Sequence, residues 1–521
     1  MTTVDVPVVF ACPNGAPITE PTITHEVIIV GAGFGGLTMA AQLQQAGVRD
    51  FLILEEGPEV GGVWRENTYP GCSCDVPAHL YCFAFDPYRD VRVRYPDQQA
   101  ILTYMREVTD RNGLRPHLRC DTAVVAADYS DTDRTWTLTT TTGELIRTGA
   151  VVWALGQLHR PAIPRLRGTE TFGGPAFHSA RWDHTADLSG QIAVVGTGSS
   201  AAQMIPELAR VAAGVTVYQR SPSWVLPKPG ASFGPLSRWA LTCVPGLHDL
   251  YRAGLYHAAD LVLAPIMRAG WSAGPAELVA RAHLRWQVRD RALRAKLTPD
   301  YRIGEKRILL DSGYYPALTQ PHVELVTDGI DRVAPDGIRT IDGAERRADV
   351  IVWATGFRAP EFLAGVRIRG RGGVDLHDRW RCRGRPTAFY GLAVPGFPNL
   401  YMIAGPHSFT PSNSNPSVKQ HQARYIMRCL TLGADWGAPV EVTERAMASY
   451  LDQLDRALAR SIWCDGVATA WWKRADGTVT NAWPGTVSEF EHAIARSDPA
   501  ESFAKVAAIA GAEGEVSGEI A

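Results

Sequence analysis

Short apolar runs that end at glycines, each followed by a helical pattern, recur along this chain. The first run covers residues 27–30; a Gly-rich turn and an Ala/Leu/Gln-rich helical stretch separate it from a second run at residues 51–54. The same order returns at residues 192–195 and 215–218. Continuous apolar runs of this length are typical of buried parallel strands, and strands that alternate with helices predict βαβ units. We therefore expect an α/β fold with two Rossmann-like dinucleotide-binding domains.

The segments around these two units show other periodicities. Residues 98–112 have a helical pattern, and residues 121–153 alternate apolar and polar positions as in a β meander. Residues 349–357 repeat the apolar run and small-residue turn of residues 151–156, and residues 400–404 form a further apolar run. Between them, residues 225–300 break the sheet pattern with helical stretches, which predicts an inserted helical lobe.

These patterns predict how the chain is divided. At 521 residues the chain is longer than one hydrophobic core usually serves, so two or three domains are expected. Residues 161–168, PAIPRLRG, read as a linker. We expect a first nucleotide domain over residues 1–165, beginning with a Pro-rich irregular arm to residue 24. A second nucleotide domain over residues 166–384 carries the lobe at about 225–300, and residues 385–521 return to the first domain and end in a C-terminal tail.

Composition and charge narrow the functional classes. The net charge of −2, without long runs of one sign, argues against nucleic acid as the main partner. The N-terminus lacks the features of a secretion signal, and no uninterrupted apolar stretch reaches membrane-spanning length. Nine scattered cysteines suit a reducing cytoplasm. Cys72 and Cys74 are interpreted as packed thiols, because no second pair or histidine cluster accompanies them, and no metal site is expected.

The first glycine turn has the chemistry of a dinucleotide site. Gly31, Gly33 and Gly36 permit a tight turn, close approach of the backbone to a pyrophosphate, and close packing of strand and helix. Glu55 ends the next apolar run, where a carboxylate can accept hydrogen bonds from both ribose hydroxyls. The alternative, a glycine turn with a surface glutamate, is disfavoured because strand, helix, second strand and terminal acid occur together.

The second turn differs at the position that matches Glu55. Gly196, Gly198 and Ala201 form the turn, and the next apolar run ends in Gln219, Arg220 and Ser221. A carboxylate repels a 2′-phosphate, whereas a guanidinium binds one with two hydrogen bonds. The first unit therefore suits FAD or NAD, and the second suits NADP.

The loop of residues 61–75, GGVWRENTYPGCSCD, follows the first nucleotide unit. It contains too much Gly and Pro for regular structure, and loops at this place build sites in α/β proteins. Gly62 and Trp64 belong to this loop. Asp75 ends it, and two interpretations of Asp75 are equally open: a cap for a following helix or a functional carboxylate.

The segment before the second unit has an unusual spacing. Phe172, Gly174, His178, Trp182 and Asp183 fit F-x-G-x-x-x-H-x-x-x-W-D without a gap. Two nucleotide turns separated by this motif resemble the class B flavin monooxygenases, and the Trp-Asp ending resembles the Baeyer–Villiger monooxygenases within that class. The loop of residues 62–75 and the residues Ala354-Thr355-Gly356 resemble further motifs of the family. The resemblance covers residues 25 to about 490.

The resemblance implies a reaction and residue roles. FAD and NADPH are the cofactors, O2 and a small hydrophobic ketone are the substrates, and an ester or lactone forms through a flavin peroxide. Arg307 and Asp75 would be the catalytic pair, and His178 would be a hinge residue that couples the domains. The residues that would hold FAD or NADP are Gly31, Gly33, Gly36, Glu55, Gly62, Trp64, Asp75, Gly196, Gly198, Ala201, Arg220, Ser221, Lys306, Ala354, Thr355, Gly356, Gly405 and Trp471. One departure, Ala201 where many members have glycine, matters little.

Three other functions are compatible with parts of this sequence. A two-nucleotide disulfide or NADH reductase is disfavoured, because no redox C-x-x-C or C-x-x-x-x-C lies beside either turn. A class B enzyme that oxygenates an amine or sulfide is the main alternative, and a non-catalytic NADP-sensing protein is weaker because both turns, Asp75 and Arg307 are intact. The lobe could line a substrate pocket, touch a membrane surface peripherally, or pack on itself. A cytoplasmic location is expected.

Overall fold

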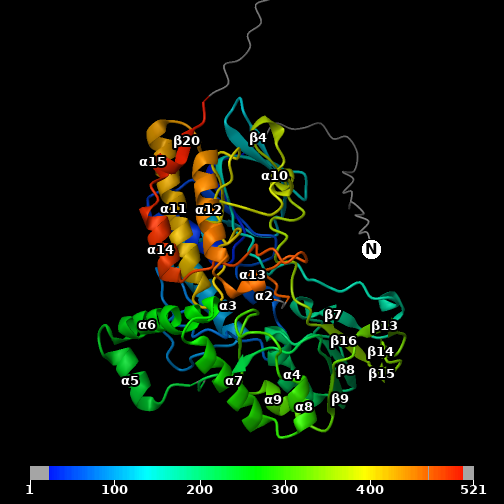
Figure 1. Cartoon of the computed structure of the whole chain (residues 1–521). Coiled ribbons are helices and arrows are strands. Elements are labelled where there is room, and N and C mark those ends of the chain that lie inside the picture. Colours follow the sequence, from blue (N-terminus) through cyan, green and yellow to red (C-terminus); the bar gives the residue numbers. More distant parts are fainter. Residues whose placement is uncertain (1–22, 231, 467–468, 508–521) are drawn as a thin grey trace, which may run out of the picture.

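The chain forms two sheet-containing parts and a helical lobe (Figure 1). The structure is a computed structural model and describes residues 23–230, 232–466 and 469–507. The irregular arm expected to residue 24 lies outside these residues except for its last two, which already belong to the first strand. None of the helices described combines the length and the apolar character needed to span a bilayer.

The first sheet contains the first predicted nucleotide unit. Strand β1 runs parallel to β2, which pairs with β3, and helix α1 connects β1 to β2. The predicted apolar runs at residues 27–30 and 51–54 are confirmed as strands. The bounds are β1 (Ile23–Val30), α1 (Phe34–Gln45), β2 (Phe51–Leu54) and β3 (Leu118–Arg119).

The predicted meander extends this sheet on the other side of β1. Strands β4, β5 and β6 pair antiparallel in sequence order, and β6 returns parallel to β1, with Ile29 opposite Val152. The short helix α2 and the predicted helix α3 precede the meander. Their bounds are α2 (Val63–Glu66), α3 (Gln98–Arg111), β4 (Val124–Ser130), β5 (Thr135–Thr140) and β6 (Leu145–Trp153).

A five-stranded sheet contains the second nucleotide unit, in the order β12-β9-β8-β16-β7. All its pairs are parallel, as the continuous apolar runs predict. The motif around His178 supplies its edge strand β7. The bounds are β7 (Ala176–His178), β8 (Gln191–Val195), α4 (Ser199–Val211), β9 (Gly214–Tyr218), β12 (Val323–Val326) and β16 (Val350–Trp353).

The predicted helical lobe lies between β9 and β12 in the chain. Helices α5 and α6 project at the lower left of Figure 1, and α7 and α8 lie to the left of the second sheet. The lobe also contributes β10, which pairs with β11 beyond it. The bounds are β10 (Val225–Leu226), α5 (Pro235–Cys243), α6 (Leu247–Ala258), α7 (Ala273–Gln287), α8 (Arg291–Lys296) and β11 (Leu309–Leu310).

The chain returns to the first sheet in two steps. Strand β17 (Arg367–Arg369) pairs with β4, and β18 (Leu400–Met402) pairs with β6. The boundary predicted after residue 384 is therefore too late, because β17 already belongs to the first sheet. Its sequence, Arg-Ile-Arg, offers one apolar side chain, so no apolar run marks it.

Helices of the C-terminal part cover the first sheet. Helix α11 (Asn415–Trp436) packs against α1, and α14 (Val487–Arg496) packs against α11. Figure 1 shows α11, α12 (Glu444–Leu458) and α14 side by side. Strand β20 (Phe503–Lys505) pairs with β19 (Val440–Val442), so the described part of the C-terminal tail is ordered against this layer.

Candidate active site

A cleft of about 2490 Å³ is lined by residues of both nucleotide units. Pockets for a single small ligand measure roughly 300–1,000 Å³, so this cleft has room for more than one. Many residues predicted for the site line it: Gly31, Gly33, Glu55, Gly62, Trp64, Asp75, Gly198, Lys306, Arg307, Ala354, Gly356 and Trp471.

The first glycine turn provides a backbone surface without side chains. Gly31 has φ +104°, and a Cβ there would lie 2.7 Å from the carbonyl oxygen of Ala154. A Cβ on Gly62 would lie 3.2 Å from the Cα of Gly33, so these two glycines allow two backbone segments to meet at the cleft. Gly36 does not line the cleft; a Cβ there would lie 1.8 Å from the Gly31 carbonyl oxygen, as expected for a packing glycine.

Glu55 is held by the protein. Its Oε2 accepts a hydrogen bond from the backbone N–H of Ala32 at 2.7 Å, and its Oε1 accepts from Gly57 N at 2.9 Å and from Arg65 Nη1 at 2.8 Å. The side chain is 6% exposed. A carboxylate has about four lone-pair sites, so acceptor capacity toward a ribose remains. The partners fix the orientation of the carboxylate at the cleft.

The second turn repeats the geometry of the first. Gly196 has φ +121°, and a Cβ there would lie 2.3 Å from the carbonyl oxygen of Ala354. Ala354 follows β16 as Ala154 follows β6, so the repeated small-residue turns are places where a neighbouring strand end presses on the glycine. Gly198 precedes α4 and is open on the side where its Cβ would point, whereas Ala201 is buried in the first turn of α4.

Three polar side chains gather beyond the second turn. Lys306 Nζ donates a hydrogen bond to Ser221 Oγ and lies 4.6 Å from the centre of the Tyr301 ring. Arg220 follows β9, and its Nη2 donates to Thr469 Oγ1 at 3.0 Å. Burial and then the charge of Arg220 lower the pKa of Lys306. The two neighbouring cations create a site that favours an anion.

Arg307 and Asp75 form a bidentate ion pair at the cleft. Arg307 Nη2 lies 2.8 Å from Oδ1 and 2.8 Å from Oδ2 of Asp75, and Nε lies 3.2 Å from Oδ2. The side chains are 25% and 19% exposed. Burial acts to lower the pKa of Arg307, but the charge and hydrogen bonds of Asp75 outweigh it and raise that pKa. The helix-cap interpretation of Asp75 is wrong, because residues 76–82 contain no helix.

The other predicted cofactor residues have different positions. Trp471 lines the cleft and meets Phe409 edge-on at 4.4 Å. Thr355 faces away and donates from Oγ1 to the carbonyl oxygen of Ala162 at 2.6 Å, while its neighbour Gly356 lines the cleft. Gly405 lies behind the lining, where a Cβ would come within 2.3 Å of the Gly391 carbonyl oxygen.

The fingerprint segment does not line the cleft, and most of its members contact the second sheet. Phe172 packs against the cluster of buried apolar residues on that sheet. A Cβ on Gly174 would lie 2.2 Å from the carbonyl oxygen of Asp349, so glycine permits close approach to the strand that follows. Trp182 is buried and meets Phe177 edge-on at 5.1 Å. Asp183 caps a turn by accepting from Thr185 N at 2.8 Å.

His178 has both ring nitrogens engaged. Nδ1 lies 3.1 Å from the backbone N of Ala180, which donates to it, and Nε2 lies 2.9 Å from the carbonyl oxygen of Gly356. This pairing assigns the proton to Nε2 in a neutral ring. Burial lowers the pKa of His178, which agrees with that state. The histidine thus ties the fingerprint to the turn after β16, and no free nitrogen is left to transfer a proton.

Two residues at the site, Gln203 and Lys419, were not predicted from the sequence. Gln203, on α4, accepts from Tyr69 OH at 3.0 Å and donates to Ser73 O at 2.9 Å, which docks the 61–75 loop on the second unit. Lys419, near the start of α11, lines the cleft, and burial lowers its pKa to about 8. Neither belongs to a motif, and no spacing signal marks them.

The cysteine pair of the loop is made of packed thiols. Cys72 and Cys74 are buried and free, and burial raises the pKa of the Cys72 thiol to about 12. Among the residues that the structure describes, no group of three or more His, Cys, Asp or Glu side chains is placed to hold a metal ion.

Comparison with known proteins agrees with this architecture. A family model described as pyridine nucleotide-disulphide oxidoreductase matches residues 28–240. Baeyer–Villiger monooxygenases of Streptomyces coelicolor and Pseudomonas aeruginosa are 37% and 36% identical, covering 96% and 93% of this chain and 100% and 93% of their own. The NADP⁺-bound cyclohexanone monooxygenase of Rhodococcus sp. Phi1 is 26% identical, with a TM-score of 0.82 over 93% of this chain and 99% of that one. Because the two Baeyer–Villiger monooxygenases are 37% and 36% identical to this chain over nearly its whole length, this chain belongs to the Baeyer–Villiger monooxygenase family.

Proposed function

We propose that this enzyme uses FAD and NADPH to insert one oxygen atom of O2 beside the carbonyl of a small hydrophobic ketone, giving an ester or lactone. The observation that carries the site assignment is the bidentate Arg307–Asp75 pair at a cleft shared by two glycine turns. Two solved relatives are structures of cyclohexanone monooxygenase. One is bound to cyclohexanone, a cyclic ketone, and the other to ε-caprolactone, a lactone.

The residues present fit the two cofactors. Gly31, Gly33 and Gly62 form a cradle that side chains would fill, and Glu55 is oriented at its edge. We place FAD there, in a domain made of residues 1–165 and the return that begins with β17. NADP lies on the second unit, where Arg220, Ser221 and Lys306 meet its 2′-phosphate. Reduced flavin supplies the activated form of oxygen, so the protein needs no nucleophile of its own.

Arg307 is assigned the central catalytic role. A guanidinium does not lose its proton in proteins, and Asp75 keeps the pKa raised, so a permanent positive charge faces the cleft. Such a charge, fixed before the reaction, stabilises negative charge that develops on oxygen in a site shielded from water. Asp75 orients the guanidinium through both carboxylate oxygens. The apolar indoles of Trp64 and Trp471 line the same cleft.

The test of this function is product analysis with single variants. Wild-type enzyme with NADPH, O2 and a panel of cyclic and linear ketones should give ester or lactone, whereas amines and sulfides should be poorer substrates. Arg307→Ala should retain FAD and still accept electrons from NADPH, but release hydrogen peroxide in place of ester. Arg307→Lys should rescue poorly, since an ammonium lacks the planar fork that meets Asp75. Ester formation by Arg307→Ala at near wild-type rate would refute the assignment.

We also propose a cytoplasmic enzyme that makes peripheral contact with anionic membrane surfaces through its lobe. Large apolar side chains are exposed on α5, α6 and α7 and nearby: Leu236, Trp239, Leu250, Trp271, Leu278 and Trp286. Exposed Arg281 and Arg285 lie on α7 beside them. The protein should sediment with phosphatidylglycerol vesicles more than with phosphatidylcholine vesicles, and Trp239→Ser with Trp286→Ser should abolish this. Equal recovery without vesicles would disprove it.

A further inference from the structure

The carboxylate of Glu66 accepts hydrogen bonds from three basic side chains. Glu66 ends α2, and its side chain is 12% exposed. Its Oε1 lies 3.3 Å from Arg65 Nη2, and its Oε2 lies 3.2 Å from His159 Nδ1 and 3.0 Å from Arg181 Nη1. Burial opposes the charged carboxylate, but the hydrogen bonds and charges of His159 and Arg181 lower the pKa of Glu66 to about 2. The carboxylate is therefore ionised at neutral pH.

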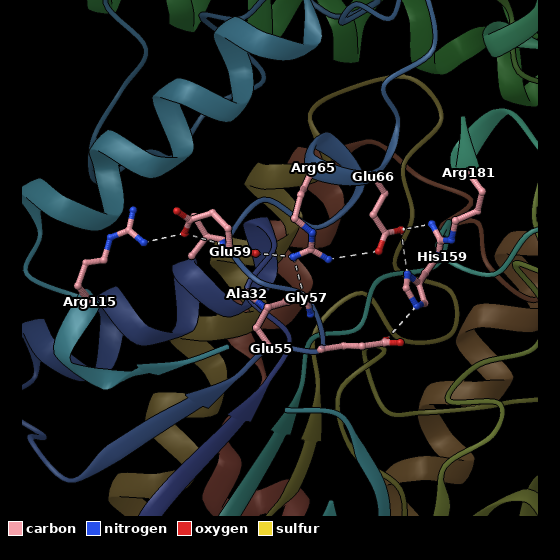
Figure 2. A network of polar contacts seen from close by, with 11 residues as sticks. Ala32, Glu55, Gly57, Glu59, Arg65, Glu66, Arg115, His159 and Arg181 are labelled. Carbon is pink, nitrogen blue, oxygen red and sulfur yellow. Dashed lines mark hydrogen bonds and ion pairs between the residues drawn. The ribbon is translucent and has the colours of Figure 1, made fainter. Parts of the chain in front are cut away.

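On one side, this carboxylate is connected to the first glycine turn. Arg65 bridges Glu66 and Glu55, and Glu55 accepts from the backbone N–H of Ala32 inside the turn. Figure 2 shows the continuous path from Ala32 through Glu55, Arg65 and Glu66 to Arg181. The first step is a hydrogen bond from a backbone N–H to a carboxylate, and each later step joins an arginine to a carboxylate.

On the other side, the carboxylate reaches the second unit. Arg181 lies between His178 and Trp182 in the fingerprint motif. His178 belongs to β7, which pairs with β16, and the His178 ring is hydrogen-bonded to the carbonyl oxygen of Gly356. The segment that carries Arg181 is therefore held on the second sheet. His159 lies in the connection between the two units and also reaches Glu56, with Nε2 3.4 Å from Oε2. Glu66 thus joins the first unit, the connection and the second unit at one point.

We propose that Glu66 is a positioning residue that sets the orientation of the NADP unit against the FAD unit, by holding Arg181 and His159 at the end of α2. A carboxylate shielded from water is stable only with its partners in place, and the partners lose their counter-charge when it is removed. The pairing therefore favours one arrangement of the two units. The inference rests on one part of the proposed function, the use of NADPH and FAD, since the orientation matters through electron delivery from NADPH to FAD.

Glu66→Gln tests the proposal, because the amide keeps the shape and removes the charge. Anaerobic stopped-flow reduction of the bound flavin, monitored by its absorbance, should be at least tenfold slower at saturating NADPH, while the Kd for NADP⁺ and the FAD content change less than twofold. Arg181→Gln should give the same result, and the double variant should be no slower than either single variant, as expected for partners in one contact.

The control is Glu144→Gln, which removes an arginine-paired carboxylate whose partner Arg119 also belongs to the first sheet. It should leave the reduction rate unchanged. Unchanged reduction in Glu66→Gln, or additive losses in the double variant, would overturn the proposal. A wild-type enzyme whose flavin is reduced by NADPH but which oxidises no ketone would refute the proposed function and leave this inference standing, because flavin reduction does not involve the ketone.

Discussion

Removing the charge of Lys306 should change coenzyme choice without weakening the free protein. Lys306→Met keeps an unbranched apolar side chain and deletes the ammonium, which donates a hydrogen bond to Ser221 and lies over the Tyr301 ring. Burial and the neighbouring Arg220 charge already disfavour that ammonium, as the lowered pKa indicates. When no anion is bound, removing the Lys306 ammonium should therefore change the free energy of unfolding little, and the midpoint of thermal unfolding should not fall.

The size of the effect on NADPH follows from the contact that is lost. A hydrogen bond to a charged group contributes about 1.5–3 kcal/mol, which corresponds to roughly 10- to 150-fold in affinity. Because Lys306 is half-buried and Arg220 is exposed, the phosphate contact of Lys306 is the less screened of the two, and a loss in the upper part of this range is expected. NADH carries no 2′-phosphate and should be used as before.

Steady-state kcat/KM for NADPH and for NADH, each with a saturating ketone, measures this selectivity. Lys296→Met is the control, since Lys296 lies in the same unit and its ammonium donates to the backbone oxygen of Leu325. The two coenzymes should be affected unequally by Lys306→Met and equally, if at all, by the control. A loss of the same size with NADPH and NADH would show that Lys306 acts through the fold and not through the phosphate.

Three further outcomes can be measured. Gly31→Ala should lose FAD, whereas Gly196→Ala should retain FAD and lose NADP⁺ binding, because each Cβ would meet a carbonyl oxygen at positive φ; flavin absorbance and NADP⁺ titration distinguish them. His178→Ala should fold and remain yellow but be reduced more slowly, and complete loss of folded protein would indicate a purely structural role. Hydrogen bonds to Glu56 and then Glu66 raise the pKa of His159 from 6.5 to about 9, so its stabilising contribution is fully present below pH 6.5 and is lost as the pH rises through about 9. This contribution of His159 to the free energy of unfolding is at most about 3 kcal/mol, and it is smaller than that because the partner Glu56 is exposed. The midpoint of thermal unfolding should therefore fall as the pH rises from 6 to 10, and His159→Gln should remove this dependence.

The strands of both nucleotide units could be predicted because they are continuous apolar runs. Residues 51–54 and 192–195 fall inside strands whose neighbours and direction also follow from the βαβ rule. Strand β17 could not be found, since a single isoleucine between two arginines carries no periodic signal. Its place in the sheet depends on β4, which lies far away in the sequence.

The site was predicted where motifs mark it and missed where contacts join distant segments. Lys306 and Arg307 are an ordinary basic pair in the sequence, and only the family resemblance assigned them different tasks. The structure places one beside Ser221 and the other against Asp75. Glu66 meets His159 and Arg181, which lie 93 and 115 residues away, and three charged residues at such separations form no pattern that periodicity could detect.

The split first sheet has a consequence for how the chain folds. Strands β4 and β6 are made early, but their partners β17 and β18 follow only after the whole second unit. During synthesis, one edge of β4 and part of β6 remain unpaired until β17 and β18 have been made. The strands of the second sheet are all contained in one stretch of the chain, so that sheet can fold on its own in the meantime. Pairings of such long sequence separation form slowly. We expect the nascent chain to be most prone to aggregation in this interval, and the C-terminal helices to close the FAD domain last.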